Sequence, residues 1–67
     1  MSQAVKLIVA GMVRLKDRQA IEDLREHREM LRARLQTTNN DFPIVKESIQ
    51  LIESDLSEIE AGLSRLQ

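Results

Sequence analysis

The sequence predicts an all-α fold: a coiled-coil-like antiparallel two-helix hairpin that assembles as a homodimeric helical bundle. The first observation is an unbroken run of apolar residues from Val45 to Leu66, spaced alternately four and three residues apart. This spacing places the apolar side chains on one stripe of a helix and is typical of a long contact with another helix. The second is a composition rich in Leu, Ile, Glu, Arg, Gln and Ala, with two Gly and one Pro, which is typical of helices. The third is a length of 67 residues without Cys, so self-association, rather than a disulfide, is expected to supplement a small core.

The first helix is predicted over residues 3–36. Apolar residues at 4–15 cover most of the circumference of a helix, which indicates burial on more than one side. A strand is the alternative for this stretch, but the sequence offers no second strand to pair with it. The polar residues 16–18 permit either one continuous helix or two helices with a break, at which Asp17 would N-cap the second. Continuity is favoured because neither Pro nor Gly occurs at this interruption.

The loop is predicted at residues 37–42 and the second helix at 43–66. Asn and Asp suit turn geometry, and Pro43 suits the first position of a helix. A short loop between two long helices makes them antiparallel neighbours. With the loop centred near Asn40, the predicted hairpin seam comprises Ile21, Leu24, Leu31, Leu35, Val45, Ile49, Ile52, Leu56, Ile59, Leu63 and Leu66.

The two helices are also expected to complement each other in charge. Residues 1–37 carry a net charge of +3 and residues 38–67 a net charge of −4, which suits two halves of one hairpin. The register predicts that Arg25 lies near Glu53, Arg18 near Glu60, and His27 near Asp55.

Residues 1–13 are predicted to overhang the hairpin as an oligomerisation segment, because the second helix reaches back only to about residue 13. This overhang is the most apolar part of the chain, and an exposed apolar patch of that size indicates an interface. A twofold dimer is the expected assembly, and a swapped hairpin is a variant that uses the same contacts. The predicted interface residues are Val5, Ile8, Val9, Met12, Val13 and Leu15.

The sequence offers no pattern of catalytic or metal-binding residues. His27 is the single His, with Asp23 one turn before it, whereas a stable metal site needs three or four ligands. No enzymatic activity, cofactor or metal is therefore expected. The expected function is a non-enzymatic, self-associating helical interaction or adaptor module that binds another macromolecule, in the first place a protein. Cytoplasmic residence is the default, since the most apolar run, residues 4–13, is too short to span a bilayer.

A small dimeric nucleic-acid-binding hairpin is the alternative function. An arginine stripe along one edge of the first helix could follow phosphates, but no aromatic residue accompanies it to stack on bases. A membrane-surface helix at residues 4–15 is a weaker alternative, because this stretch lacks Trp and Phe. The arginine stripe comprises Arg14, Arg18, Arg25, Arg28 and Arg32.

Overall fold

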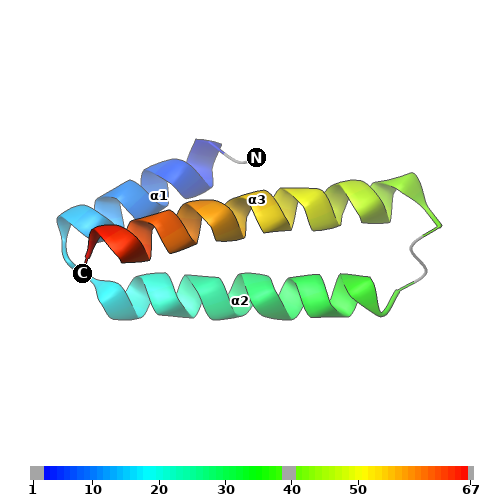
Figure 1. The fold of residues 1–67 in the computed structure, drawn as a ribbon, viewed down its shortest axis with the longest axis horizontal. Helices are drawn as coiled ribbons and strands as arrows, with labels where there is room; N and C mark the ends of the chain where they lie inside the picture. Colours follow the sequence, from blue (N-terminus) through cyan, green and yellow to red (C-terminus); the bar gives the residue numbers. More distant parts are fainter. Residues whose placement is uncertain (1–2, 39–40, 67) are drawn as a thin grey trace.

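The structure, a computed structural model, describes residues 3–38 and 41–66 of the chain. Within these residues it contains three helices and no strand: α1 (Gln3–Arg14), α2 (Arg18–Gln36) and α3 (Pro43–Arg65). α2 and α3 lie side by side and run in opposite directions, while α1 folds back along α3 and runs parallel to it (Figure 1). The all-α prediction is confirmed, but the prediction of a two-helix chain is wrong because the first predicted helix is divided in two.

The division occurs at residues 15–17, and its geometry explains why no Gly or Pro was needed. Lys16 adopts the left-handed conformation, with φ of 56°. The amides of Lys16 and Asp17 donate to the carbonyls of Val13 and Met12, the two hydrogen bonds of a Schellman motif that ends a helix. The Asp17 carboxylate then accepts a hydrogen bond from the amide of Ala20 and N-caps α2. The expected continuous helix over residues 3–36 is therefore incorrect, and the alternative of a break capped by Asp17 is correct.

Replacing Lys16 with glycine is expected to raise the free energy of unfolding by about 1 kcal/mol. The left-handed conformation costs a residue with a Cβ roughly 1–2 kcal/mol, whereas glycine adopts it freely at the end of a helix. Urea denaturation followed by circular dichroism would measure the change. Lys16→Ala serves as the control and should bring no gain, since alanine keeps the Cβ. Equal stabilities for the glycine and alanine variants would contradict a left-handed residue here.

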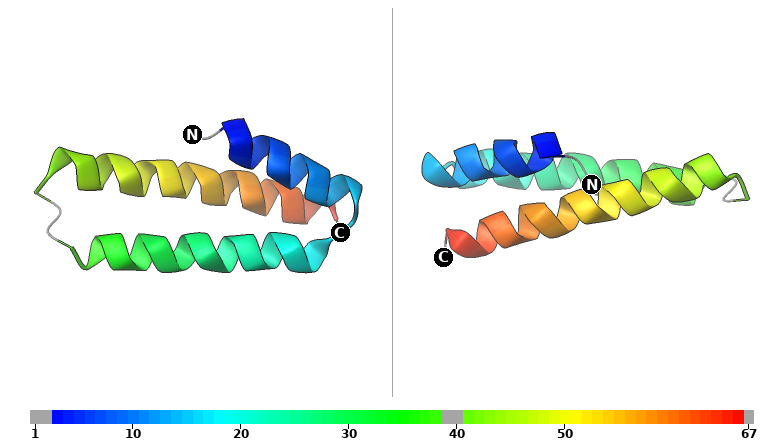
Figure 2. Two further views of the ribbon diagram at one scale, coloured as in Figure 1. Left: turned by 180° about the vertical axis from the view of Figure 1, so that it is seen from behind. Right: turned by 90° about the horizontal axis from the view of Figure 1, so that it is seen from above.

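α1 packs against α3 instead of overhanging the hairpin. Val5 and Val9 are buried against Ile21 of α2 and against Ile59 and Leu63 of α3. Figure 2 shows from two sides that α1 lies along the half of the molecule that contains the C-terminal end of α3. The predicted overhang of residues 1–13 is thus wrong for the described residues 3–13, because the chain reverses at Lys16. Residues 1–2 lie outside the described part.

Gly62 permits this close approach of α1 to α3. It is buried, and a Cβ built on it would overlap Cγ1 of Val9 and lie 3.5 Å from Cγ2 of Val13. A glycine at the contact between two helices removes the side chain that would otherwise hold their backbones apart. Gly62 therefore sets the distance at which α1 packs.

The connection between α2 and α3 agrees with the sequence prediction. α2 ends at Gln36 and α3 begins at Pro43, which occupies the first turn as its fixed φ favours. α3 ends at Arg65, one residue before the expected end. Residues 39–40 of the predicted loop and residue 67 lie outside the described part.

The seam between α2 and α3 uses the predicted residues in a displaced register. Ile21, Leu56, Ile59 and Leu63 are buried. The other seam residues are half-buried, namely Leu24, Leu31, Leu35, Val45, Ile49, Ile52 and Leu66.

Two ion pairs show the displacement. Arg25 pairs with Glu60, not Glu53, at 3.1 Å between Nη1 and Oε1. Arg28, not His27, pairs with Asp55, at 3.5 Å between Nε and Oδ2. The partner of Arg25 lies seven residues, about two helical turns, beyond the predicted one, and Asp55 pairs with the residue next to its predicted partner. Because α1 packs on Gly62 and Leu63, the position of α3 depends on three helices and not on two.

Candidate functional site

The outer face of α1, defined by Leu7, Ile8, Gly11 and, one residue beyond the helix end, Leu15, is the most apolar exposed surface near the start of the chain. Leu7 is 65% exposed, Ile8 48% and Leu15 78%. Gly11 lies between them, and a Cβ built there would meet nothing within 4 Å. Large aliphatic side chains clustered on one face and left in water are typical of an interaction surface. The outer face is thus the leading candidate site.

The structure divides the predicted interface residues between two surfaces. Val5 and Val9 are buried in the core, and Met12 and Val13 pack partly buried against it. These four residues are thus engaged within the chain, and their contact with a second chain stays a prediction. Ile8 and Leu15 remain exposed. Leu7 was not among the predicted interface residues, but it is exposed beside them, because the inner face of α1 is the one that packs on the core.

A second exposed apolar surface, the distal patch, is defined by Ile44, Glu47 and Leu51 of α3. Ile44 is 69% exposed and Leu51 is 51% exposed. Ile44 lies eighteen residues before Gly62, about five turns of helix, so the patch faces the same side of α3 as the glycine on which α1 packs.

The distal patch was not predicted, although its signal is present in the sequence. Ile44 and Leu51 each come one residue before a seam residue and are seven residues apart. The seam residues Val45 and Ile52 were sufficient to predict a helix here, so Ile44 and Leu51 were not assigned to any contact. A second apolar stripe beside a heptad seam indicates a second contact surface on the same helix.

The predicted arginine stripe does not form a continuous basic surface. Arg25 and Arg28 pair with Glu60 and Asp55 of α3. The hydrogen bond to Glu60 raises the pKa of the Arg25 guanidinium, although desolvation opposes this. These pairs place acidic groups beside the cations, which weakens attraction to phosphates. Of the other three arginines of the stripe, Arg14 and Arg18 are exposed and Arg32 is half-buried.

Asp55 is a buried charged residue that the sequence analysis assigned to a different partner. It is buried between the helices, and its Oδ1 has no hydrogen-bond partner among the described residues. His27, its expected neighbour, is exposed, and its Nδ1 lies against Nη1 of Arg28. A buried carboxylate that loses its counter-charge is costly, so Asp55 favours the register in which Arg28 reaches it.

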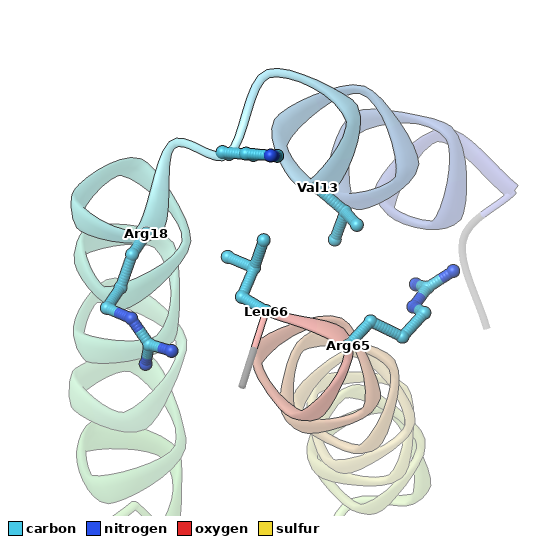
Figure 3. A pocket seen from close by; sticks show the side chains of 5 residues that line it. Val13, Arg18, Arg65 and Leu66 are labelled. Atoms are coloured by element: carbon cyan, nitrogen blue, oxygen red, sulfur yellow. The ribbon is translucent and has the colours of Figure 1, made fainter.

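A shallow hollow lies at the end of the bundle where the α1–α2 turn meets the C-terminal end of α3. Its volume is about 300 Å³, and its lining combines apolar and basic side chains. Figure 3 shows Val13 and Leu66 on facing sides of the hollow, while Arg18 extends along α2 and Arg65 extends outward from α3 on the other side. The cations therefore do not converge on one point, as an anion-binding site requires. The lining comprises Val13, Lys16, Arg18, Arg65 and Leu66.

The described residues contain no group of three or more His, Cys, Asp or Glu placed to hold a metal ion. None of the helices in the described part is long and apolar enough to cross a membrane. The site reduces to two exposed apolar surfaces, the outer face of α1 and the distal patch of α3. Comparison of the chain with family models, with curated proteins and with solved structures finds no match.

Proposed function

We propose that this protein is a non-enzymatic helical interaction module that self-associates as a dimer through the outer face of α1. The assembled module would present its remaining surface to another macromolecule, in the first place a protein. The observation that carries the proposal is the exposure of Leu7, Ile8 and Leu15 on a helix whose opposite face is already buried. A helix that is apolar on two sides needs two neighbours, and α3 supplies one of them.

The energetics of the outer face favour a weak assembly. Burying one large aliphatic side chain fully contributes about 1.5–3 kcal/mol. The three side chains of the outer face are partly exposed, so two copies together would contribute on the order of 10 kcal/mol at most. Association costs about 4–15 kcal/mol. The difference is at most about 6 kcal/mol, so self-association is expected at tens of micromolar or above, and a further contact surface would strengthen it.

Light scattering across the micromolar range tests the proposal, with Ile8→Asp as the variant. Wild-type protein should shift from monomer to dimer as its concentration rises, whereas Ile8→Asp should stay monomeric. Because Ile8 is 48% exposed, the substitution should leave the monomer folded. It should lower the unfolding temperature only at concentrations where wild-type protein assembles, since assembly and stability are coupled.

Ala33→Asp is the matched control, because it introduces the same carboxylate at an exposed position of α2 and should assemble normally. Wild-type protein that remains monomeric at all these concentrations would contradict the proposal. The nucleic-acid alternative has its own readout, a salt-dependent mobility shift with RNA or duplex DNA that is lost in Arg18→Ala/Arg25→Ala. Such a shift in a monomeric protein would favour the alternative.

A further inference from the structure

We infer that the outer face of α1 docks on the distal patch of a second copy of this chain, so that the two α1 helices lie end to end between two facing hairpins. The inference rests on the proposed self-association and names its contact surfaces. Each α1 would pack on its own α3 with Val5 and Val9 and on the second copy's α3 with Ile8 and Leu15. Both exposed apolar surfaces would then be covered by one twofold arrangement.

The lengths of the helices support this arrangement. α1 has 12 residues and α3 has 23, which correspond to about 18 Å and about 34 Å at 1.5 Å per residue. α1 covers only the half of α3 that includes Gly62, and along the other half, which includes Ile44 and Leu51, the described residues place α2 beside α3 and no third helix (Figures 1 and 2). Two α1 helices end to end match the length of one α3. A second copy's α1 is therefore the right length for the uncovered half.

The spacing of the exposed residues supports a single register. Ile8 and Leu15 are seven residues apart, as are Ile44 and Leu51, and residues seven apart lie on one face of a helix about 10.5 Å from each other. α1 runs parallel to its own α3 (Figure 1), so in a twofold pair with facing hairpins it runs antiparallel to the second copy's α3. Leu15 then lies opposite the second copy's Ile44, and Ile8 opposite the second copy's Leu51.

Gly11 fits the middle of this contact. It lies between Ile8 and Leu15 and leaves open space on the outer face. Glu47 lies between Ile44 and Leu51, so its longer side chain would meet the glycine and not a second large residue. Alternating large and small positions are what allow two helix surfaces to interdigitate.

Charge complementarity favours α3 of the second copy, and not its α1, as the neighbour of the outer face of α1. The described charged residues from Gln3 to Lys16 are all basic, namely Lys6, Arg14 and Lys16. Packing two α1 helices face to face would bring these cations together. The distal patch instead offers Glu47, with Glu58 about three turns further along the same side of α3. Opposite charges around an apolar centre favour this pairing and disfavour the α1–α1 pairing.

Disulfide trapping tests the register directly, because the sequence contains no Cys. The variant Leu15→Cys/Ile44→Cys should form a covalent dimer on mild oxidation. A bond within one chain is excluded, since the two positions lie near opposite ends of a molecule about 40 Å long (Figure 1) and a disulfide requires Cα atoms within about 7 Å. Leu15→Cys/Ser57→Cys is the matched control. Its second cysteine lies on an exposed position of α3 away from the patch, and it should form no covalent dimer under the same conditions.

The single variants separate the two possible dimers. Leu15→Cys alone and Ile44→Cys alone should not cross-link, and efficient cross-linking of Leu15→Cys alone would indicate α1–α1 pairing and overturn the inference. Leu51→Asp supplies a second measurement without oxidation. It should abolish dimerisation in light scattering as Ile8→Asp does, while circular dichroism shows an unchanged helical fold.

The outcomes distinguish failure of this inference from failure of the proposed function. Wild-type dimers together with a Leu51→Asp variant that dimerises normally would overturn the inference and leave self-association in place. Wild-type protein that stays monomeric would overturn both. A monomer that binds vesicles of anionic phospholipid through α1, and loses that binding in Ile8→Asp, would assign the outer face to a membrane surface and would also overturn both.

Discussion

Replacing Gly62 with valine is expected to displace α1 from α3 and to lower the free energy of unfolding by about 2–3 kcal/mol. The new Cβ would overlap Cγ1 of Val9, and Val9 is fully buried in the core, so neither side chain has room to move. Inserting atoms into a packed core costs typically 1–3 kcal/mol, and valine is a stiff residue in a helix. Urea denaturation would measure the loss. In hydrogen exchange, the Gly62→Val substitution should also accelerate the amides of α1 more than those of α2.

Gly11→Ala is the matched control on the other side of α1. A Cβ at Gly11 meets nothing within 4 Å, and alanine is favoured over glycine in a helix by about 1 kcal/mol. Gly11→Ala should therefore stabilise the monomer, whereas Gly62→Val destabilises it. Adding Val9→Ala to Gly62→Val should recover part of the loss by removing the overlapping methyl groups. A Gly62→Val protein as stable as wild type would contradict the docking of α1 on α3.

Replacing Ile59 with alanine is expected to lower the free energy of unfolding by about 2–5 kcal/mol, the usual cost of truncating a buried isoleucine. Ile59 is fully buried where all three helices meet, in contact with the cluster formed by Val9, Ile21 and Leu63. At roughly 0.05–0.15 kcal/mol per residue, a chain of this size has only about 3–10 kcal/mol of stability to lose. Circular dichroism at increasing temperature should show a broadened and much lower transition.

Met30→Ala is the control for this truncation, because Met30 is about half exposed on α2 and lies outside the core cluster. Its substitution should change the free energy of unfolding by less than about 1 kcal/mol, as is usual for surface positions. If both substitutions cost the same, Ile59 does not occupy the centre of the core.

The hairpin of α2 and α3 was predictable because its signals are local. The stripe of apolar residues from Val45 to Leu66 specifies which side of α3 is buried, and the 3.6-residue period fixes that side without knowledge of the neighbour. Pro43 marks the start of α3 for an equally local reason, since its fixed φ suits a first turn. These features appear in the structure where the sequence placed them.

The break at Lys16 was not predictable from the same kind of signal. Intrinsic preference disfavours a left-handed lysine, so the sequence favoured a continuous helix. The conformation is adopted because the reversal buries Val5 and Val9 against Ile21, Ile59 and Leu63, a gain that exists only once three helices are assembled. Tertiary burial outweighs a local cost of roughly 1–2 kcal/mol.

The sequence by itself determined that the chain is helical, where α3 begins, and which residues of α3 face inward, because each of these follows from periodicity or from the backbone geometry of one residue. It offered Asp17 as a capping residue only in the alternative that was not favoured, and it marked residues 4–15 as apolar on more than one side without deciding which of them stay exposed. Only the tertiary structure decided that Val5 and Val9 find their neighbours within the chain, that Arg28 and not His27 reaches Asp55, and that Ile44 and Leu51 are left exposed. The physical reason is that a helix with apolar residues on two sides is compatible with more than one neighbour, and the choice depends on where the chain reverses and how closely the helices approach at Gly62.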